Sequence, residues 1–167
     1  MSGFENPSDG EPTRVFFDTN VLVYCFDSSE ARKQNRAKDL LAHALNTRQG
    51  VVSYQVVQEF CNVACKNQRL SLPHERIMAY VNLVLQPMNR VASSPELLTA
   101  ALGIRSENGF SFYDSLVIAA AQEAKCQVLY SEDMQHLQRV GGLQVVNPFL
   151  DVANEASAVH MPVPSRR

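Results

Sequence analysis

Four acidic residues of this 167-residue chain occupy positions where they could do chemistry together. Asp18 ends the short apolar run 14–17, Glu59 lies in the second turn of a predicted helix, Asp114 lies in the first turn of another, and Asp133 follows a later strand. In open parallel sheets, ligands bind beyond the carboxyl ends of the strands. The acids therefore suggest an oxygen-ligand site for a hard divalent cation. Mg²⁺ or Mn²⁺ fits better than zinc, because no His or Cys joins the set.

Each acid also has an ordinary structural explanation. Asp18 could cap the turn after its strand, Glu59 could be a solvated helix acid, and Asp133 could lie at the N-terminus of a helix. Ser111 and Asp114 fit a capping box. However, the helix that carries Asp114 is apolar nearly all round, which is typical of a buried helix. A carboxylate buried there is costly unless something compensates its charge, and a bound cation would do so.

Strand and helix patterns alternate along the chain. Strands are predicted over residues 14–17, 51–53, 88–92, 127–131 and 143–147. Helices are predicted over residues 30–46, 54–66, 73–86 and 111–124, with a further helix beginning at 94–95, while 21–26 fits either a short helix or an extension of the first strand. This alternation requires crossover connections, so it predicts an α/β fold with a parallel sheet covered on both faces.

The composition predicts one folded domain over residues 14–151, between a flexible N-terminal tail (1–13) and a flexible C-terminal tail (152–167). Hydrophobic residues make up 46% of the chain, and the net charge of −2 gives no strongly basic coat for nucleic acid. Within residues 14–151 the acidic and basic residues are equal in number. If a metal neutralised the four acids of the site, the net charge of this domain would be mildly positive, which is compatible with an RNA substrate. Without a signal peptide, an apolar span or a CxxC pair, we expect a cytoplasmic protein with reduced, mostly buried cysteines.

Several motifs of the chain together resemble the PIN-domain nucleases, and in particular the VapC-like toxins of bacterial toxin–antitoxin pairs. These motifs are RVFFDTNVLVY, VVSYQVVQEFCNVA, FSFYDSLVIAAAQEAKCQVLYSEDMQHLQ and GGLQVVNPF. The resemblance extends over roughly residues 14–150. It implies a three-layer α/β/α sandwich with a central, mainly parallel sheet, whose acids gather at the carboxyl ends of the strands and bind Mg²⁺ or Mn²⁺.

The resemblance also assigns roles to individual residues. The catalytic and metal-binding acids that match by motif are Asp18, Glu59, Asp114 and Asp133. Asn20 and Ser131 match small polar residues that hydrogen-bond these acids. Glu132 leaves open which acid of the last pair faces the metal.

The activity implied by the resemblance is metal-assisted hydrolysis of RNA phosphodiester bonds, leaving a 5′-phosphate and a 3′-hydroxyl. It further implies an antitoxin protein as partner and a homodimer. No membrane partner is expected, because no apolar stretch of the sequence is long enough to span one. A non-catalytic PIN-like module that binds RNA or protein is the alternative. A phosphatase with an aspartate nucleophile is disfavoured, because Asn20 stands where such enzymes need a second aspartate.

Four basic residues lie on the first long predicted helix, away from its apolar face. They are Arg32, Lys33, Arg36 and Lys38. The ordinary interpretation is a solvated helix face. The functional interpretation is contact with an RNA backbone, since phosphate contacts position nucleic acid without reading its sequence.

Overall fold

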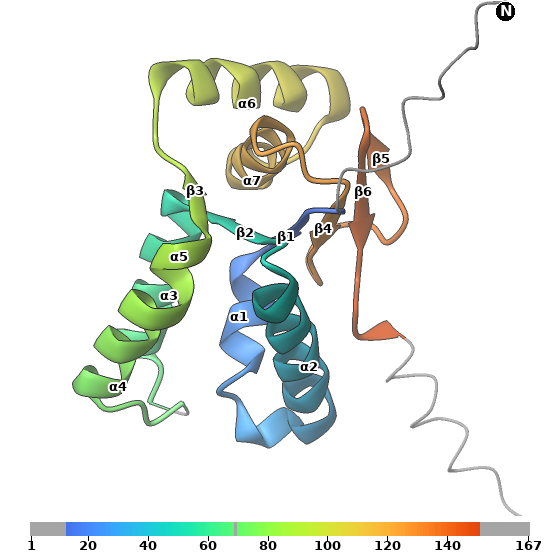
Figure 1. Cartoon of the computed structure of the whole chain (residues 1–167). Coiled ribbons are helices and arrows are strands. Elements are labelled where there is room, and N and C mark those ends of the chain that lie inside the picture. The colour runs from blue at the N-terminus through green and yellow to red at the C-terminus, as the bar shows by residue number, and fades with distance from the viewer. Residues whose placement is uncertain (1–12, 69, 151–167) are drawn as a thin grey trace, which may run out of the picture.

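The computed structural model describes residues 13–68 and 70–150 as a sheet between two layers of helices (Figure 1). The sheet has six strands in the order β3-β2-β1-β4-β6-β5. All neighbouring strands pair in parallel except β5 and β6, which are antiparallel. The predicted α/β sandwich with a mainly parallel sheet is thereby confirmed.

The strands are short. They comprise β1 (Val15–Phe17), β2 (Gly50–Ser53), β3 (Asn89–Val91), β4 (Val128–Tyr130), β5 (Arg139–Val140) and β6 (Leu143–Val146). β1 lies in the middle of the sheet, where Phe16 pairs with Val51 of β2 and with Leu129 of β4. These central residues are fully buried, as expected for strands covered by helices on both faces.

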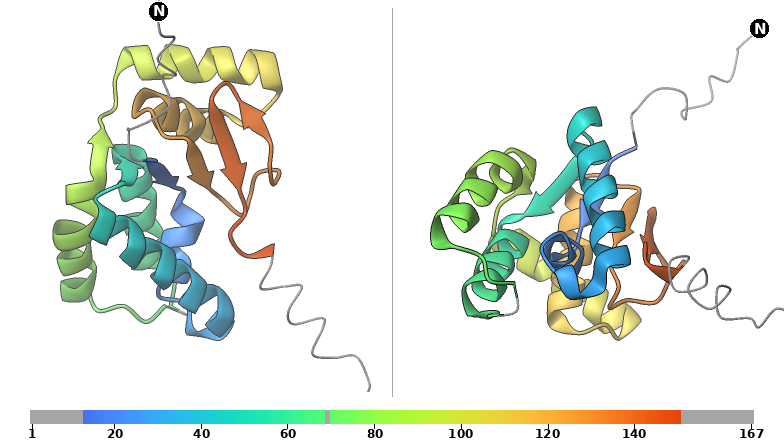
Figure 2. Two further views of the ribbon diagram at one scale, coloured as in Figure 1. Left: turned by 45° about the vertical axis from the view of Figure 1, so that its right-hand side comes forward. Right: turned by 90° about the horizontal axis from the view of Figure 1, so that it is seen from below.

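The helices divide between the two faces of the sheet. They are α1 (Thr19–Tyr24), α2 (Ala31–Thr47), α3 (Tyr54–Lys66), α4 (His74–Tyr80), α5 (Gln86–Met88), α6 (Pro95–Asn108) and α7 (Phe112–Glu123), with a 3₁₀ turn η1 (Ser28–Glu30) and a π-helical turn η2 (Val81–Leu85). Helices α6 and α7 pack together on one face, and α1, α2 and α3 pack on the other, as the further views in Figure 2 also show. None of these helices is long and apolar enough to cross a membrane.

Local sequence signals explain where the helices begin. The side chains of Ser53, Ser94 and Ser111 accept hydrogen bonds from backbone N–H groups in the first turns of α3, α6 and α7. Asp18 does the same for α1 through the N–H of Thr19. This cap makes residues 19–24 a helix, which decides between the two structures that the sequence allowed for this segment.

Three features differ from the sequence-based expectations. β5 was not predicted, because two residues are too few to show alternation; it forms a hairpin with β6 across Gly141, whose φ is +59°. Asp133 lies in no helix, so the capped-helix explanation for this acid is wrong. Of the four free cysteines, Cys61 is only partly buried and Cys65 is exposed.

Residues 1–12 and 151–167, which include nearly all of both predicted tails, lie outside the described residues.

Candidate active site

Asp18 is a buried carboxylate at the carboxyl end of the central strand. Its side chain is 7% exposed. Oδ1 accepts a hydrogen bond from the N–H of Thr19 at 2.7 Å, and Oδ2 accepts one from the hydroxyl of Ser131 at 2.7 Å. The amide of Asn20 lies 3.4 Å from Oδ2. These donors come from α1 and from the loop after β4, so neighbouring strands of the sheet bring them together.

Burial raises the pKa of Asp18 to about 6, against an ordinary value of 3.8. The hydrogen bonds from Ser131 and Thr19 oppose this change, while the negative charges of Asp133 and Glu59 add to it. No Lys, Arg or His of the described residues forms an ion pair with these three acids. The ionised form of Asp18 is therefore costly here unless a cation comes from outside the chain.

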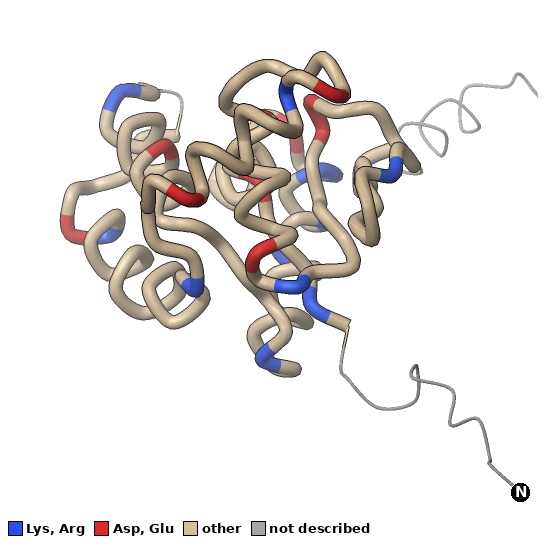
Figure 3. Tube along the Cα trace, turned by 90° about the horizontal axis from the view of Figure 1, so that it is seen from above, with Lys and Arg blue, Asp and Glu red and all other residues tan. Residues whose placement is uncertain are grey.

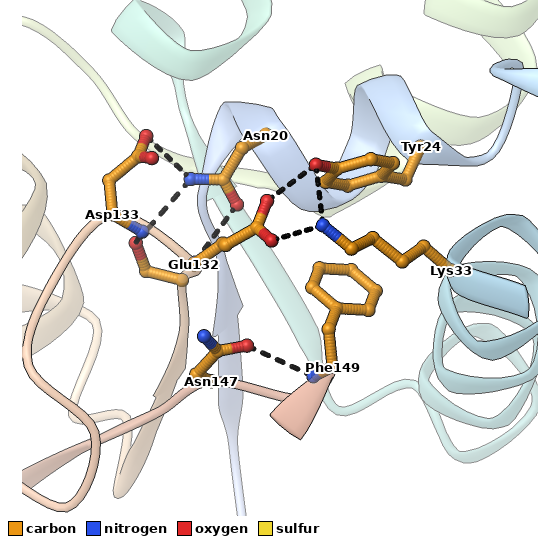
Figure 4. Close-up of polar contacts among 8 residues, drawn as sticks. Asn20, Tyr24, Lys33, Glu132, Asp133, Asn147 and Phe149 are labelled. Atoms are coloured by element: carbon orange, nitrogen blue, oxygen red, sulfur yellow. Dashed lines mark hydrogen bonds and ion pairs between the residues drawn. The ribbon is translucent and has the colours of Figure 1, made fainter. Parts of the chain in front are cut away.

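Asp133 is the second acid of this group. Its Oδ2 accepts a hydrogen bond from the amide of Asn20 at 3.0 Å, and its backbone N–H donates to the hydroxyl of Ser131 at 3.3 Å. Figure 4 shows Asp133 and Asn20 facing each other. Asn20 and Ser131 thus each contact both Asp18 and Asp133.

Glu59 approaches the group from the second turn of α3. Its Oε2 accepts a hydrogen bond from the hydroxyl of Thr19 at 2.8 Å, and its Oε1 accepts one from the amide of Gln55 at 2.7 Å. The sequence-based search missed both donors. Thr19 lies inside the motif between Asp18 and Asn20. Gln55 precedes Glu59 by four residues, a spacing that places two side chains on one face of a helix.

Glu132 points away from Asp133 and toward Tyr24 and Lys33 (Figure 4). Its carboxylate accepts a hydrogen bond from the Tyr24 hydroxyl at 2.6 Å and forms an ion pair with Lys33 at 2.5 Å. The Lys33 ammonium also lies 4.8 Å from the centroid of the Tyr24 ring and 5.7 Å from that of Phe149. Burial acts to lower the pKa of Lys33, but the hydrogen bonds with Glu132 and Tyr24 outweigh it and raise the pKa.

Asp114 lies in the first turn of α7, and its backbone N–H donates to the capping hydroxyl of Ser111 at 3.1 Å. The predicted capping box is therefore partly realised. The side chain of Asp114 is partly exposed, whereas residues 115–121 of the same helix are buried. Within residues 13–68 and 70–150, no hydrogen bond links its carboxylate to the other three acids, and no three acidic, His or Cys side chains form a ready-made metal cluster.

The basic residues of α2 have different environments. Lys33 is engaged by Glu132, and the guanidinium of Arg36 donates to the carbonyl of Pro148 at 3.4 Å. Arg32 is exposed, and Lys38 borders a groove between α2 and α4. Figure 3 shows basic positions spread over several elements of the fold. Lys33 is thus partly buried in an ion pair. Its environment differs from the solvated one considered for the four basic residues.

A cavity of about 380 Å³ opens beside the acids. Its lining includes Thr19, Asn20, Tyr24, Glu132 and Asp133. Polar side chains from α1 and from the loop after β4 therefore face a space large enough for part of a nucleotide. The carboxylate oxygens, amide and hydroxyls around it are the donor types that hard cations prefer.

This chain is similar in fold to several solved structures. It is similar to a toxin–antitoxin complex from Klebsiella pneumoniae (21% identity, TM-score 0.57, 80% of this chain and 97% of that chain). It is also similar to VapC20 of Mycobacterium tuberculosis, a toxin that cleaves the sarcin-ricin loop (22% identity, TM-score 0.51, 71% and 89%), and to PAE2754 of Pyrobaculum aerophilum (19% identity, TM-score 0.52, 86% and 98%). At these identities the likeness shows the fold. No curated protein matches.

The model of a protein family also matches this chain. The model of the PIN domain matches residues 15–143, which include every strand and helix around the site. The match begins at β1, immediately before Asp18, and ends at the first residue of β6. The chain therefore belongs to the PIN domain family.

Proposed function

We propose that this protein is a metal-dependent endoribonuclease and the toxin of a toxin–antitoxin pair. The observation that carries the proposal is the buried carboxylate of Asp18, which has two acidic neighbours and no cationic partner among the described residues. Nucleases of the PIN domain family generally use divalent metal ions. The toxins among the similar structures support the biological role.

The donor atoms of the site are of the type that hard divalent cations prefer, which supports the proposal. Asp18, Glu59 and Asp133 offer carboxylate oxygens on neighbouring elements, and the charges of the latter two act on Asp18. Asp114 is the fourth proposed ligand, directly or through water, on the strength of its motif. When bound, Mg²⁺ or Mn²⁺ stabilises charge on the phosphate oxygens and lowers the pKa of a bound water.

The chain's own polar residues would keep the acids in place for this reaction. Asn20 bridges Asp133 and Asp18, while Thr19 and Gln55 each hold one oxygen of Glu59. Both oxygens of Glu59 therefore have fixed partners, and its carboxylate plane is set before any ligand binds. Such prior orientation reduces the reorganisation needed when charge develops on the substrate.

The proposal is tested by incubating the purified protein with structured RNA, with EDTA and with added Mg²⁺ or Mn²⁺. We expect cleavage only with metal, yielding a 5′-phosphate and a 3′-hydroxyl. Asp18→Asn and Asp114→Asn should each remain folded and lose cleavage, whereas Asp39→Asn, at an exposed position of α2, should cleave normally. Full activity of Asp18→Asn would contradict the site. RNA binding without cleavage in all conditions would favour a non-catalytic PIN-like module.

We also propose the domain bounds, the partners and the cellular compartment of the enzyme. We expect residues 14–151 to form the nuclease domain, a small antitoxin protein to inhibit it, and a homodimer to be the working unit in the cytoplasm. Arg32, Arg36 and Lys38 remain candidates for contact with the RNA backbone, whereas Lys33 is engaged by Glu132. Copurification with the product of a neighbouring gene, followed by measurement of the molar mass, tests both partners.

A further inference from the structure

Basic residues gather at the end of the sheet opposite the acids, where the parallel strands begin. They belong to four strands that are neighbours in the order β3-β2-β1-β4. Arg90 lies in β3, and Arg48, Arg14 and Lys125 come shortly before β2, β1 and β4. Figure 3 shows several basic positions near the N-terminal end of the described chain. We call these four residues the basic edge.

Arg90 reaches this edge through its side chain. Its guanidinium donates to the backbone carbonyl of Arg48 at 3.4 Å. Burial raises the pKa of Cys126, just before β4, to about 12, and the positive charges of Arg14 and Arg90 oppose this change. Both guanidinium groups therefore act on one thiol, which places their charges at the same end of the sheet.

The basic edge has no counter-charge among residues 13–68 and 70–150, because none of its four residues forms an ion pair there. Arg48, Arg90 and Lys125 are exposed. Within the described chain the guanidinium of Arg48 makes no hydrogen bond, and that of Arg90 makes the single one to the carbonyl of residue 48. Since a guanidinium has five N–H donors, most of these donors are available to a ligand.

A cavity of about 280 Å³ opens between Arg48 and Arg90. The described residues that line it, from the end of α2, the beginning of β2, α5 and β3, include no acid. The helix dipole explains part of this arrangement, because it favours cations at the C-terminal end of α2. The two positive charges nevertheless repel each other, and a bound anion would compensate both.

We propose that the basic edge binds backbone phosphates of the RNA substrate, with one phosphate held by Arg48 and Arg90 in this cavity. This inference rests on the proposed ribonuclease function. A guanidinium pairs with a phosphate through two parallel N–H donors. A row of cations on strands about 4.8 Å apart suits a polyanion better than a single small anion. Such contacts position RNA without reading its sequence.

The place of the basic edge sets a minimum length for the RNA. Val15 of β1 is level with Gly50 of β2. Asp18 follows Val15 by three residues and Arg48 precedes Gly50 by two, so about 16 Å of sheet separates the acid from the arginine. This distance corresponds to about five nucleotide steps along one strand of a duplex. A shorter RNA at the acids does not reach the basic edge.

The test is fluorescence anisotropy with a labelled hairpin RNA of about 20 nucleotides, in EDTA and over about 50–200 mM KCl. In the double variant Arg48→Gln with Arg90→Gln, the slope of log K against log salt should be smaller by about 1–2, as the loss of one or two phosphate contacts predicts. Binding at low salt should be about tenfold weaker. Lys66→Gln removes a charge at an exposed position of α3 outside the cavity, and should retain the wild-type slope.

Further measurements distinguish phosphate binding from a change of structure. The single variants Arg48→Gln and Arg90→Gln cover the case in which the double variant does not fold, and each should lower the slope. Stabilisation by Mg²⁺ or Mn²⁺ should persist in all of them, because the acids are remote. In a series of RNAs of increasing length, the difference from wild type should appear only beyond about five nucleotides.

The outcomes separate this inference from the proposed function. An unchanged slope in the folded variants, or an equal change in Lys66→Gln, would overturn the phosphate site and leave the ribonuclease intact. Polyglutamate that binds as tightly as RNA, and loses its binding in the double variant, would overturn RNA as the occupant in favour of an acidic protein. If the wild-type protein binds the hairpin as expected but cleaves no RNA with Mg²⁺ or Mn²⁺, the proposed function fails and the phosphate site stands.

Discussion

The cost of ionising the buried carboxyl group of Asp18 predicts that Asp18→Asn stabilises the metal-free protein. The carboxyl group has a pKa of about 6 in the folded state and 3.8 as its ordinary value. This difference corresponds to about 3 kcal/mol of unfolding free energy lost when the group ionises. Because the side chain is almost completely buried, little of this is removed by solvent screening. Asparagine avoids the cost, since it stays neutral at every pH.

Part of the gain is offset by hydrogen bonding. The asparagine oxygen can still accept from the N–H of Thr19, but the amide would have to donate to the Ser131 hydroxyl, which donates to Asp18 in the native protein. This exchange costs about 1 kcal/mol. A net gain of about 2 kcal/mol remains, equivalent to a rise in melting temperature of about 4–8 °C for a chain of this size.

The sign of the pH dependence follows from the raised pKa. Below about pH 3, Asp18 is protonated in the folded and unfolded states, so the variant has no electrostatic advantage there. Between pH 4 and 6 the unfolded chain loses its proton first, and the stability contributed by this group in the native protein falls as the pH rises. The advantage of Asp18→Asn should therefore develop over this interval and stay constant above it.

The assay is thermal and urea denaturation from pH 4 to pH 7 in EDTA, with Asp39→Asn as the matched exposed control. Added Mg²⁺ or Mn²⁺ should then stabilise the wild-type protein at pH 7, by about 2.7 kcal/mol at a hundredfold excess over the dissociation constant, and leave Asp18→Asn nearly unchanged. An Asp18→Asn variant that is less stable than wild type at pH 7, or an advantage that does not vary with pH, would refute the reasoning.

Further substitutions test the frame around the site. Ser111→Ala removes the cap of α7 and should cost about 1 kcal/mol in urea denaturation. Phe60→Ala removes a fully buried ring packed against two other aromatic rings, and should cost about 3–5 kcal/mol in the same measurement. Glu132→Gln breaks the partly buried ion pair and should cost about 1 kcal/mol while the metal response persists, whereas Asp133→Asn should weaken the metal response at little cost in stability.

Much of the fold was predictable because its determinants are local. Helix α3 begins and ends where the apolar spacing predicted, and the Ser-Pro pair at 94–95 begins α6. The position of Asp18 was predictable for the same reason, since a strand, an acid and a helix follow one another within the chain. The two-residue strand β5 was not, because it exists only through its pairing with β6.

The contacts that hold the site together depend on residues far apart in sequence. The bond between Ser131 and Asp18 joins residues 113 positions apart, and the bond between Thr19 and Glu59 joins residues 40 positions apart. Spacing alone could place each of these side chains at the same edge of the sheet. It could not show which oxygen each donor reaches, because this depends on the packing of α1 between its neighbours.

The two adjacent acids after β4 show why the roles of site residues cannot be assigned without the tertiary contacts. Glu132 and Asp133 are equivalent by charge and sequence position, so the motif left open which of them faces the metal. In the fold, Glu132 has a cation of its own in Lys33, whereas Asp133 faces Asn20 and adds its charge to the field that raises the pKa of Asp18. A second cation would gain little beside a carboxylate that is already paired, and more beside one whose charge is uncompensated. Charge pairing, rather than order in the chain, therefore favours Asp133 as the metal-facing acid.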